Sequence, residues 1–370
     1  MADRTAITVG IAGAGAIALA VAVLLEEAGH RAVLWSPSGE GTAAFRNGAP
    51  LVAEGAVTAT VSPAVASSAA ALCEADALIL ALPAYGHKTV MDQLAPHIKD
   101  DQPVIISSHA ALGALYLSKL LAARGLQPPI VAWGTTVATA RRKGPSTVAI
   151  NTVRSRVDIA TLPTRESERG QRLCTTLFGE RFNDKGALLA VQLSNLNPQN
   201  HMGIALCNMT RMEQGETWSQ GANVTPNVGR LLEALDRERL AIAGALGLKV
   251  RTIFEHFHLS FHVPEASVSA MNQQMHAQGR GGTGPATADS RYVTEDVPYG
   301  LAATVTLGAM TGRPAVLHQA GVDLFSALYG RDFAAQNDLF AALDLGAMPI
   351  ETLEKLAEDG FSPANSADKS

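Results

Sequence analysis

One stretch near the N-terminus constrains the fold of this chain more than any other feature: Ile7-Thr8-Val9-Gly10-Ile11-Ala12-Gly13-Ala14-Gly15-Ala16-Ile17-Ala18. An apolar strand leads into the pattern G-x-G-x-x-A, and an apolar helix follows. Gly13 permits the tight turn, and Gly15 lets phosphate groups approach the backbone. The first N–H groups of the helix, at Ala16 and Ile17, are then available to an anion. The stretch therefore predicts a Rossmann domain that binds the pyrophosphate of a dinucleotide.

Apolar runs alternate with helical stretches through the first half of the chain. The expected strands comprise residues 7–12, 30–35, 57–61, 77–81, 104–107, 130–133, 147–151 and 157–162. We expect a helix to begin at Ser62-Pro63, directly after the third of these strands. Strands that are apolar throughout and separated by helices are typical of a parallel sheet covered on both faces. The fold class predicted is α/β, with a doubly wound Rossmann sheet over residues 1–190.

The second half of the chain reads as a domain built of helices. The longest pattern runs from Val228 to Leu246, and its charged residues are expected to form a solvated face with local ion pairs: Glu233, Asp236, Arg237, Glu238 and Arg239. Further helices are expected near residues 268–276, 300–310, 315–328 and 348–359. We therefore predict an all-helical domain over residues 191–360, followed by a flexible tail over residues 361–370.

Composition limits the partners and the compartment. The net charge is −5 and no basic stripe is present, so nucleic acid is not an expected partner. Cys73, Cys174 and Cys207 lie far apart, and we expect buried thiols in a cytoplasmic protein and no metal site. The apolar run after Ile11 is too short for a membrane span and carries the glycine pattern. We expect a small-molecule substrate, no membrane contact and a homodimer.

The end of the second strand bears on the choice of cofactor. In this fold an acidic residue at that point usually binds the ribose hydroxyls of NAD, but here the chain reads Ser36-Pro37-Ser38. A carboxylate would repel a 2′-phosphate, whereas two hydroxyls can donate hydrogen bonds to it. We therefore expect NADP, with NAD possible because no arginine follows directly and only Arg46 could reach in. Leu82-Pro83, after the strand at 77–81, are expected to border the same cofactor.

Two polar clusters in the helical half are candidates for chemistry. The first runs from Leu193 to Met202 and contains His201, the one side chain there that exchanges a proton near neutral pH. It could equally be an asparagine-rich turn with a hydrogen-bonded histidine. The second runs from Ser290 to Gly300, where Glu295 or Asp296 either caps a helix or orients a histidine. Arg291 in this second cluster could clamp a substrate carboxylate.

Together these motifs resemble the octopine/nopaline (opine) dehydrogenase family over roughly residues 7–350. The glycine pattern is followed by S-N-x-N-x-x-x-H, then L-D-R-E-R-L-A-I-A-x-A-L-G, then R-Y-x-T-E-D-x-P-x-G. The resemblance implies a Rossmann domain, a helical domain and an active site in the cleft between them. It also implies reduction, by NADH or NADPH, of the imine formed from a 2-oxo acid and an amino acid. His201 matches the catalytic histidine, Asp296 its carboxylate partner and Arg291 the substrate-carboxylate ligand; Asn197 and Tyr292 are further substrate-binding candidates.

The chain departs from that family in two places. Trp133-Gly134-Thr135-Thr136-Val137-Ala138-Thr139 lacks the acidic residue and proline turn of many relatives, and Ser107-Ser108-His109 replaces a more glycine-rich turn. Both segments follow strands, where ligands of this fold bind. The alternative is therefore an NAD(P)-dependent dehydrogenase acting on a ketone and secondary alcohol, or on a simple amine, on the same scaffold.

Overall fold

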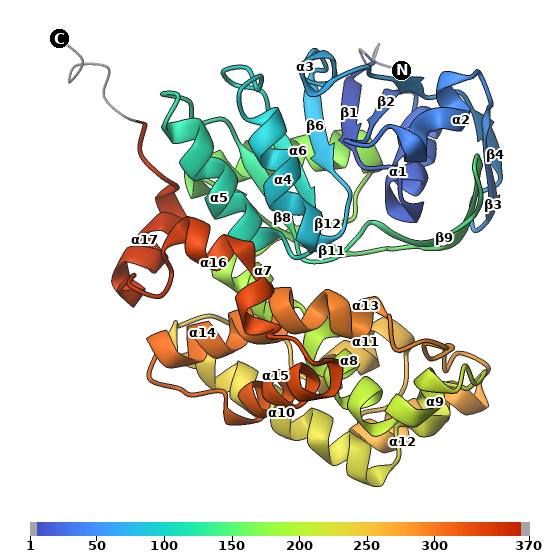
Figure 1. The fold of residues 1–370 in the computed structure, drawn as a ribbon, viewed down its shortest axis with the longest axis vertical. Coiled ribbons are helices and arrows are strands. Elements are labelled where there is room, and N and C mark those ends of the chain that lie inside the picture. Colours follow the sequence, from blue (N-terminus) through green and yellow to red (C-terminus); the bar gives the residue numbers. More distant parts are fainter. Residues whose placement is uncertain (1–5, 364–370) are drawn as a thin grey trace. The chain divides into compact units, whose positions relative to one another are not determined.

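The computed structural model describes residues 6–363, which form two compact units. The first unit comprises the chain up to Gln192 together with the chain from Glu351 onward, and the second comprises Leu193–Ile350. Figure 1 shows the strands gathered in the N-terminal part and the helices of the second unit coloured from yellow-green at α8 to orange-red at α16. Each unit has its own hydrophobic core.

An eight-stranded sheet organises the first unit. Its strands stand in the order β12-β11-β8-β7-β6-β1-β2-β5. Their bounds are β1 (Thr8–Ala12), β2 (Arg31–Trp35), β5 (Ala64–Val65), β6 (Ala77–Leu80), β7 (Val104–Ser107), β8 (Ile130–Trp133), β11 (Val157–Leu162) and β12 (Phe182–Asp184). All neighbouring pairs are parallel except β8 and β11. The predicted doubly wound sheet is confirmed, with one antiparallel pair near its edge.

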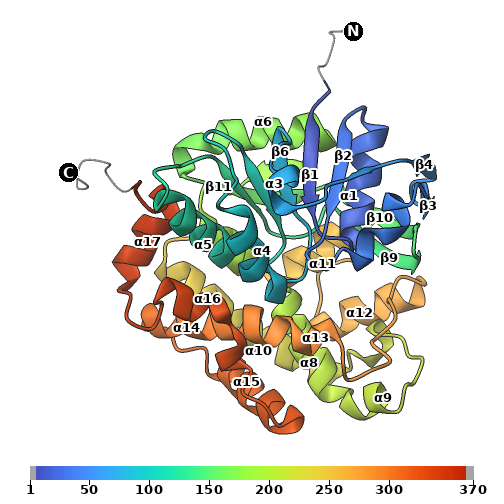
Figure 2. The same ribbon diagram turned by 45° about the horizontal axis from the view of Figure 1, so that its top comes forward.

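Helices cover both faces of this sheet. They are α1 (Ala16–Glu27), α2 (Ala43–Arg46), α3 (Ala69–Leu72), α4 (His87–Leu94), α5 (Ala110–Ala122), α6 (Ser167–Phe178), α7 (Leu188–Ser194) and α17 (Ile350–Asp359), with one-turn 3-10 helices η1 (Glu40–Thr42), η2 (Ala84–Gly86) and η3 (Thr164–Glu166). Helix α1 contacts α6, while α4 contacts both α3 and α5. Figure 2 shows α6 on the opposite side of the sheet from α4 and α5. Crossover connections of this kind are what a parallel sheet requires.

A second sheet in this unit was not predicted. It has the order β4-β3-β10-β9, formed by β3 (Leu51–Gly55), β4 (Ala59–Val61), β9 (Ala138–Gly144) and β10 (Thr147–Val153). The strand expected at 57–61 is shorter and belongs to this sheet. The helix expected at Ser62-Pro63 is wrong, since strand β5 follows there and the first helical turn begins at Ala69. The parallel pairing of β3 with β10 joins segments almost 100 residues apart, so no local pattern could indicate it.

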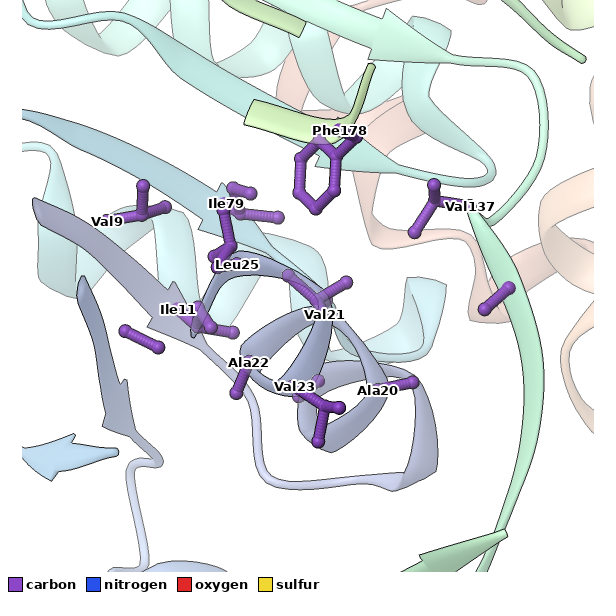
Figure 3. Packing of buried hydrophobic residues seen from close by; sticks show 14 of the residues in the cluster. Val9, Ile11, Ala20, Val21, Ala22, Val23, Leu25, Ile79, Val137 and Phe178 are labelled. Atoms are coloured by element: carbon purple, nitrogen blue, oxygen red, sulfur yellow. The ribbon is translucent and has the colours of Figure 1, made fainter. Parts of the chain in front are cut away.

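The second sheet explains why α1 is so apolar. Helix α1 contacts β1 and β2 of the large sheet and also β3, β9 and β10 of the small one. A helix that is apolar all round is buried on every side, and residues 18–23 of α1 are fully buried. Figure 3 shows Val21 and Leu25 of α1 beside Ile11 and Ile79 of the large sheet. Burying each such side chain contributes roughly 1.5–3 kcal/mol. None of the helices among the described residues is long and apolar enough to cross a membrane.

The last helix belongs to the first unit, which corrects the predicted boundary at residue 360. Gln127 Nε2 donates to Asp359 O over 2.9 Å, and Phe361 N donates to Ser118 Oγ over 2.9 Å. Helix α17 also buries Leu353 and Ala357. These contacts fix the chain as far as Phe361. Of the tail predicted over residues 361–370, residues 364–370 lie outside the described residues.

The second unit is helical, as predicted. It contains α8 (Asn197–Cys207), α9 (Met209–Glu213), α10 (Pro226–Ala245), α11 (Ile253–Phe261), α12 (Val268–Ala277), α13 (Arg291–Thr294), α14 (Ala302–Met310), α15 (Val316–Tyr329) and α16 (Asp338–Leu343). Short 3-10 turns lie at η4 (Gly221–Asn223) and η6 (Ala334–Gln336), and η5 (Val297–Leu301) is one turn of π-helix. Cys207 at the end of α8 is exposed, so the expectation of three buried thiols is wrong at this position, while Cys73 and Cys174 are buried.

Two charged residues expected on a solvated face of α10 lie in the core instead. Asp236 and Arg239 are each 2% exposed and form an ion pair over 2.7 Å. Asp236 also accepts hydrogen bonds from Gln199 Nε2 and Ile253 N. Arg239 donates to the carbonyl oxygens of Leu193 and Arg251. Arg237 is the one residue of the five charged residues that is exposed. The predicted solvated face is therefore wrong at Asp236 and Arg239, because partners from other segments satisfy the buried charges.

Glu238 on the same helix is bonded to the beginning of α15. Its carboxylate accepts hydrogen bonds from Leu317 N and His318 N, and it lies 2.8 Å from His318 Nδ1. Burial alone would raise the pKa of Glu238, but the hydrogen bonds from the His318 side chain and from both backbone N–H groups outweigh it and lower the pKa. Glu238 therefore satisfies N–H groups that α15 leaves without helical partners.

We expect Glu238→Gln to lower the free energy of unfolding near pH 7 by about 1–2 kcal/mol, because the amide offers one acceptor and no charge. A carboxyl whose folded pKa lies below the ordinary 4.5 stabilises above that pH and loses the effect as the pH falls through its folded pKa. The difference from wild type should therefore shrink below about pH 4.5. Urea unfolding at pH 7 and pH 3.5 measures it, with exposed Glu265→Gln as the control. A difference as large at pH 3.5 as at pH 7 would contradict this account.

Candidate active site

The glycine-rich turn between β1 and α1 has the geometry of a phosphate cradle. Gly13 has φ +137°, and a Cβ there would lie 2.4 Å from Ala81 O, so no side chain fits. Gly13 N donates to Trp35 O over 2.8 Å, which ties the turn to the end of β2. A Cβ at Gly15 would meet no atom within 4 Å. The space beside Gly15 is therefore open to a ligand.

Helix α1 begins at this turn, and the backbone N–H groups of its first residues have no partner within the helix. Its first helical hydrogen bond runs from Leu19 N to Gly15 O over 3.0 Å. The N–H groups of Ala16 and Ile17 precede that bond and have no acceptor four residues back in the helix. The positive end of the helix dipole lies at the same point. Both predicted residues thus stand where an anionic pyrophosphate would be held.

The predicted cofactor residues after β2 and β6 border the same turn. Ser36-Pro37-Ser38 follow Trp35, whose carbonyl contacts Gly13. The Ser36 Oγ atom is buried and makes no hydrogen bond to any described residue. A buried hydroxyl normally has a partner, so Ser36 Oγ fits a ligand oxygen there. Leu82-Pro83 directly follow Ala81, which lies against Gly13, and the Leu82 carbonyl accepts from His87 Nε2.

The turn after β7 departs from the family pattern in sequence but keeps an unusual backbone. Ser108 has φ +72° and His109 has φ +46°, both in the left-handed region. Glycine adopts this conformation readily, whereas other residues are strained there by about 1–2 kcal/mol each. Ser108 and His109 therefore place side chains at this end of the strand in a left-handed turn that glycine would adopt more readily.

In the second unit, the fold brings together three of the predicted site residues. Asp296 Oδ2 lies 2.7 Å from His201 Nδ1, and the side chains are 7% and 17% exposed, respectively. The Tyr292 ring stacks on the His201 ring, with centroids 3.5 Å apart and planes 9° from parallel. Tyr292 is held in turn by its hydroxyl, which donates to Gln220 Oε1. The hydrogen bond and the stacked ring together fix the plane of the imidazole.

Local structure explains how these residues reach one another. His201 lies in the second turn of α8, which begins with Asn197 and Pro198 at its N-terminus. Asp296 precedes the π-helical turn Val297–Leu301. Such turns are frequent at functional sites because they redirect neighbouring side chains. The alternative in which Asp296 merely caps a helix finds no support, since it makes no side-chain capping bond there.

Arg291 and Asn197 lie close in sequence to this cluster but outside the ring contact. Arg291 Nε forms an ion pair with the carboxylate of Glu295. The Arg291 side chain is 59% exposed, whereas Glu295 is 3% exposed. Asn197 is exposed and lies one helical turn before His201, so the two share a face of α8. The structure therefore anchors Arg291 through Glu295, which the sequence offered only as a helix cap or as the partner of a histidine.

Arg142 is another residue that sequence reasoning did not single out. It lies on β9 of the small sheet, and its Nη1 donates to Ala14 O in the glycine-rich turn over 2.7 Å. No spacing along the chain indicates this contact, because it joins positions 128 residues apart. Among the described residues, no group of three His, Cys, Asp or Glu is placed to hold a metal ion.

Comparisons with known proteins agree with both halves of this description. Residues 185–329 match the family model described as "NAD/NADP octopine/nopaline dehydrogenase, alpha-helical domain", and residues 9–164 match "Ketopantoate reductase PanE/ApbA". The chain is 28% identical to an opine dehydrogenase from Arthrobacter sp. (strain 1C) over 364 residues, which cover 96% of this chain and 97% of that protein.

Solved structures share the fold. Octopine dehydrogenase with NADH and L-arginine has a TM-score of 0.77 at 15% identity, covering 94% of this chain and 98% of that one. NADP+-bound yersinopine dehydrogenase has a TM-score of 0.69 at 18% identity, covering 93% and 99%. The matches define a two-domain NAD(P)-dependent dehydrogenase. The resemblance to the octopine/nopaline dehydrogenases that the motifs predicted is confirmed, in the helical half by the family model and over the whole chain by the opine dehydrogenase relative.

Proposed function

We propose that this dehydrogenase uses NADPH to reduce the imine formed from a 2-oxo acid, or another carbonyl compound, and an amine or amino acid. The observation that carries the proposal is the hydrogen bond of 2.7 Å between His201 Nδ1 and Asp296 Oδ2. With Nδ1 committed to Asp296, Nε2 is the atom of the imidazole that can exchange a proton with substrate. When bound, the nicotinamide supplies the hydride.

The residues of the chain supply position and the proton. In the direction of reduction, His201 Nε2 donates a proton to the substrate nitrogen, and in oxidation the neutral ring takes it back. Asp296 stabilises the imidazolium and keeps its Nδ1–H oriented. Tyr292 holds the ring plane from one face. Arg291, anchored at Nε by Glu295, presents its guanidinium to a substrate carboxylate, and Asn197 contributes a polar contact from the same face of α8.

The cradle in the first unit is suited to the cofactor. Gly13 and Gly15 form the turn, the N–H groups of Ala16 and Ile17 hold the pyrophosphate, and Leu82-Pro83 border it. Ser36, Pro37 and Ser38 stand where an acidic residue would favour NAD, so we propose NADPH as the preferred cofactor. This preference is supported by the unpartnered Ser36 hydroxyl and by the absence of a carboxylate at that position of the sequence.

The amine requirement tests the proposed reaction. We expect NADPH oxidation only when an oxo acid and an amine or amino acid are both present. Pyruvate and L-arginine are a sensible first pair, because solved structures of octopine dehydrogenase contain each of them with NADH. The measurement is loss of absorbance of NADPH across a panel of oxo acids, each with and without a panel of amines. If NADPH is oxidised at the same rate without any amine, the proposal is wrong and the reaction is instead reduction of a ketone to a secondary alcohol.

A further inference from the structure

Arg142 joins the two segments that surround the adenosine end of a Rossmann cofactor. Its Nη1 donates to Ala14 O, between the two glycines of the phosphate turn, over 2.7 Å. Its Nη2 donates to Gly41 O over 3.1 Å, in the 3-10 turn that follows β2. A Cβ at Gly41 would lie 2.6 Å from the Ala14 Cβ, so the two segments touch each other beside this guanidinium.

The charge of Arg142 is not neutralised by the protein. Its four hydrogen bonds go to the carbonyl oxygens of Ala14, Gly41, Gly144 and Pro145. Among the described residues, no carboxylate lies within ion-pair distance of it. A guanidinium has five N–H donors, so one donor and the whole positive charge are left for a ligand. Carbonyl oxygens hold the group in place without cancelling that charge.

Ser36 provides a second, independent indication of a ligand at the same place. Its Oγ is buried and unpartnered among the described residues. It directly follows Trp35, whose carbonyl accepts from Gly13 N. In an NAD-specific Rossmann domain this is where the carboxylate that binds the ribose 2′-hydroxyl stands. Here a hydroxyl replaces the carboxylate and a cation lies at the adjoining turn, which is the arrangement that a 2′-phosphate requires.

We propose that Arg142, reaching over from the small sheet, binds the 2′-phosphate of NADPH and sets the preference for it over NADH. The inference rests on the proposed use of NADPH and names the residue responsible. Arg46 is the other arginine near this loop, but it is exposed, and its contacts among the described residues are with Gly39 O and Thr42 Oγ1. Arg142 alone of the two contacts the phosphate turn itself. In our proposal Ser36 Oγ donates to the same phosphate.

Binding measurements on the full chain without substrate test this assignment. We expect Arg142→Gln to weaken NADPH about ten- to hundredfold, the usual effect of losing a hydrogen bond to a charged group. NADH should change by less than about threefold. Adenosine 2′,5′-bisphosphate and adenosine 5′-monophosphate differ only in the 2′-phosphate, and we expect the same contrast between them. Calorimetric titration of all four ligands gives the ratios.

Arg141→Gln is the matched control, because Arg141 is exposed and adjacent on the strand and therefore points to the opposite face. It should bind all four ligands like the wild type. If Arg142→Gln does not fold, the same titrations are made on Arg142→Met, which keeps the aliphatic part of the side chain and its packing. Equal weakening of NADPH and NADH would show that Arg142 only supports the turn and would overturn the proposal, as would no change in either.

The test also separates this inference from the proposed reaction. No imine is present in the titrations, so failure of the amine panel leaves the Arg142 result unaffected. A wild-type chain that binds NADH as tightly as NADPH would refute the cofactor preference and the role of Arg142 together. A wild-type preference for NADPH that survives Arg142→Gln would refute the role of Arg142 alone.

Discussion

Replacing His201 by alanine is expected to lower kcat by about 10²–10⁴-fold, the usual contribution of a positioned general acid. The affinity for NADPH should stay nearly unchanged, because the residues assigned to the cofactor lie in the first unit and His201 lies in the second. Steady-state kinetics with a productive oxo acid and amine pair give kcat, and titration with NADPH gives the affinity. Full activity in this variant would remove the proposed role of His201.

The companion variant Asp296→Asn tests whether the carboxylate charge at position 296, and not merely the space it fills, is needed to orient His201. Asparagine fills the same space but removes the charge that stabilises an imidazolium, and its NH2 group can face Nδ1 and hold the wrong tautomer. We expect a loss of kcat of at least about tenfold, smaller than that of His201→Ala. His276→Ala is the matched control: His276 is an exposed histidine of the same unit, bonded to Ser219 Oγ, and it should leave kcat unchanged.

Some of the site could be predicted because its signals are local. The turn from Gly13 to Ile17 owes its shape to backbone geometry that nearby residues encode, and the structure has the strand, turn and helix where the sequence put them. Gly29 has φ +84° just after α1, as a helix terminator should. His201 and Asp296 are different, since they are 95 positions apart. Spacing left their roles open, and only the family resemblance paired them.

What the sequence did not reveal depends on contacts across long distances in the chain. Strand β3 is short, and its apolar run of Leu51-Val52-Ala53 ends at once in Glu54-Gly55, so it gives only a weak strand signal. Its sheet forms only when residues 138–153 return to pair with it. Arg142 reaches Ala14 through that sheet, which is why no motif near the glycine turn contained it. Helix α1 is apolar on all sides because this same sheet covers it.

The charged face predicted for α10 was wrong for a related reason. Periodicity places Asp236 and Arg239 on one side of a helix, but it cannot tell whether that side meets water or other polar groups. The partners that make burial tolerable come from α8, from Leu193 in α7 and from the start of α11. Charges are buried only when paired and hydrogen-bonded, so this arrangement follows from the tertiary structure alone.

Arg239→Met should therefore be the most destabilising single change considered for the second unit. It leaves the Asp236 carboxylate buried at 2% exposure without its ion-pair partner and leaves the carbonyl oxygens of Leu193 and Arg251 without their donor. Breaking a buried pair in this way costs about 3–5 kcal/mol. Arg237→Met on the exposed face of the same helix is the control and should stay within about 0.5 kcal/mol of wild type. Thermal and urea unfolding measure both.

The same pair also bears on the active site, because Asp236 holds Gln199, two residues before His201 on α8. Arg239→Met keeps Asp236 but removes the guanidinium that fixes its carboxylate. The carboxylate should then shift and loosen its hold on Gln199 and on the beginning of α8, so kcat should fall at temperatures where the variant is still folded. Burial lowers the pKa of the Arg239 guanidinium, and the Asp236 carboxylate opposes that shift. A variant of wild-type stability would show that the buried pair contributes no net stabilisation. Lost stability with an unchanged kcat would instead show that the pair supports the core without positioning His201.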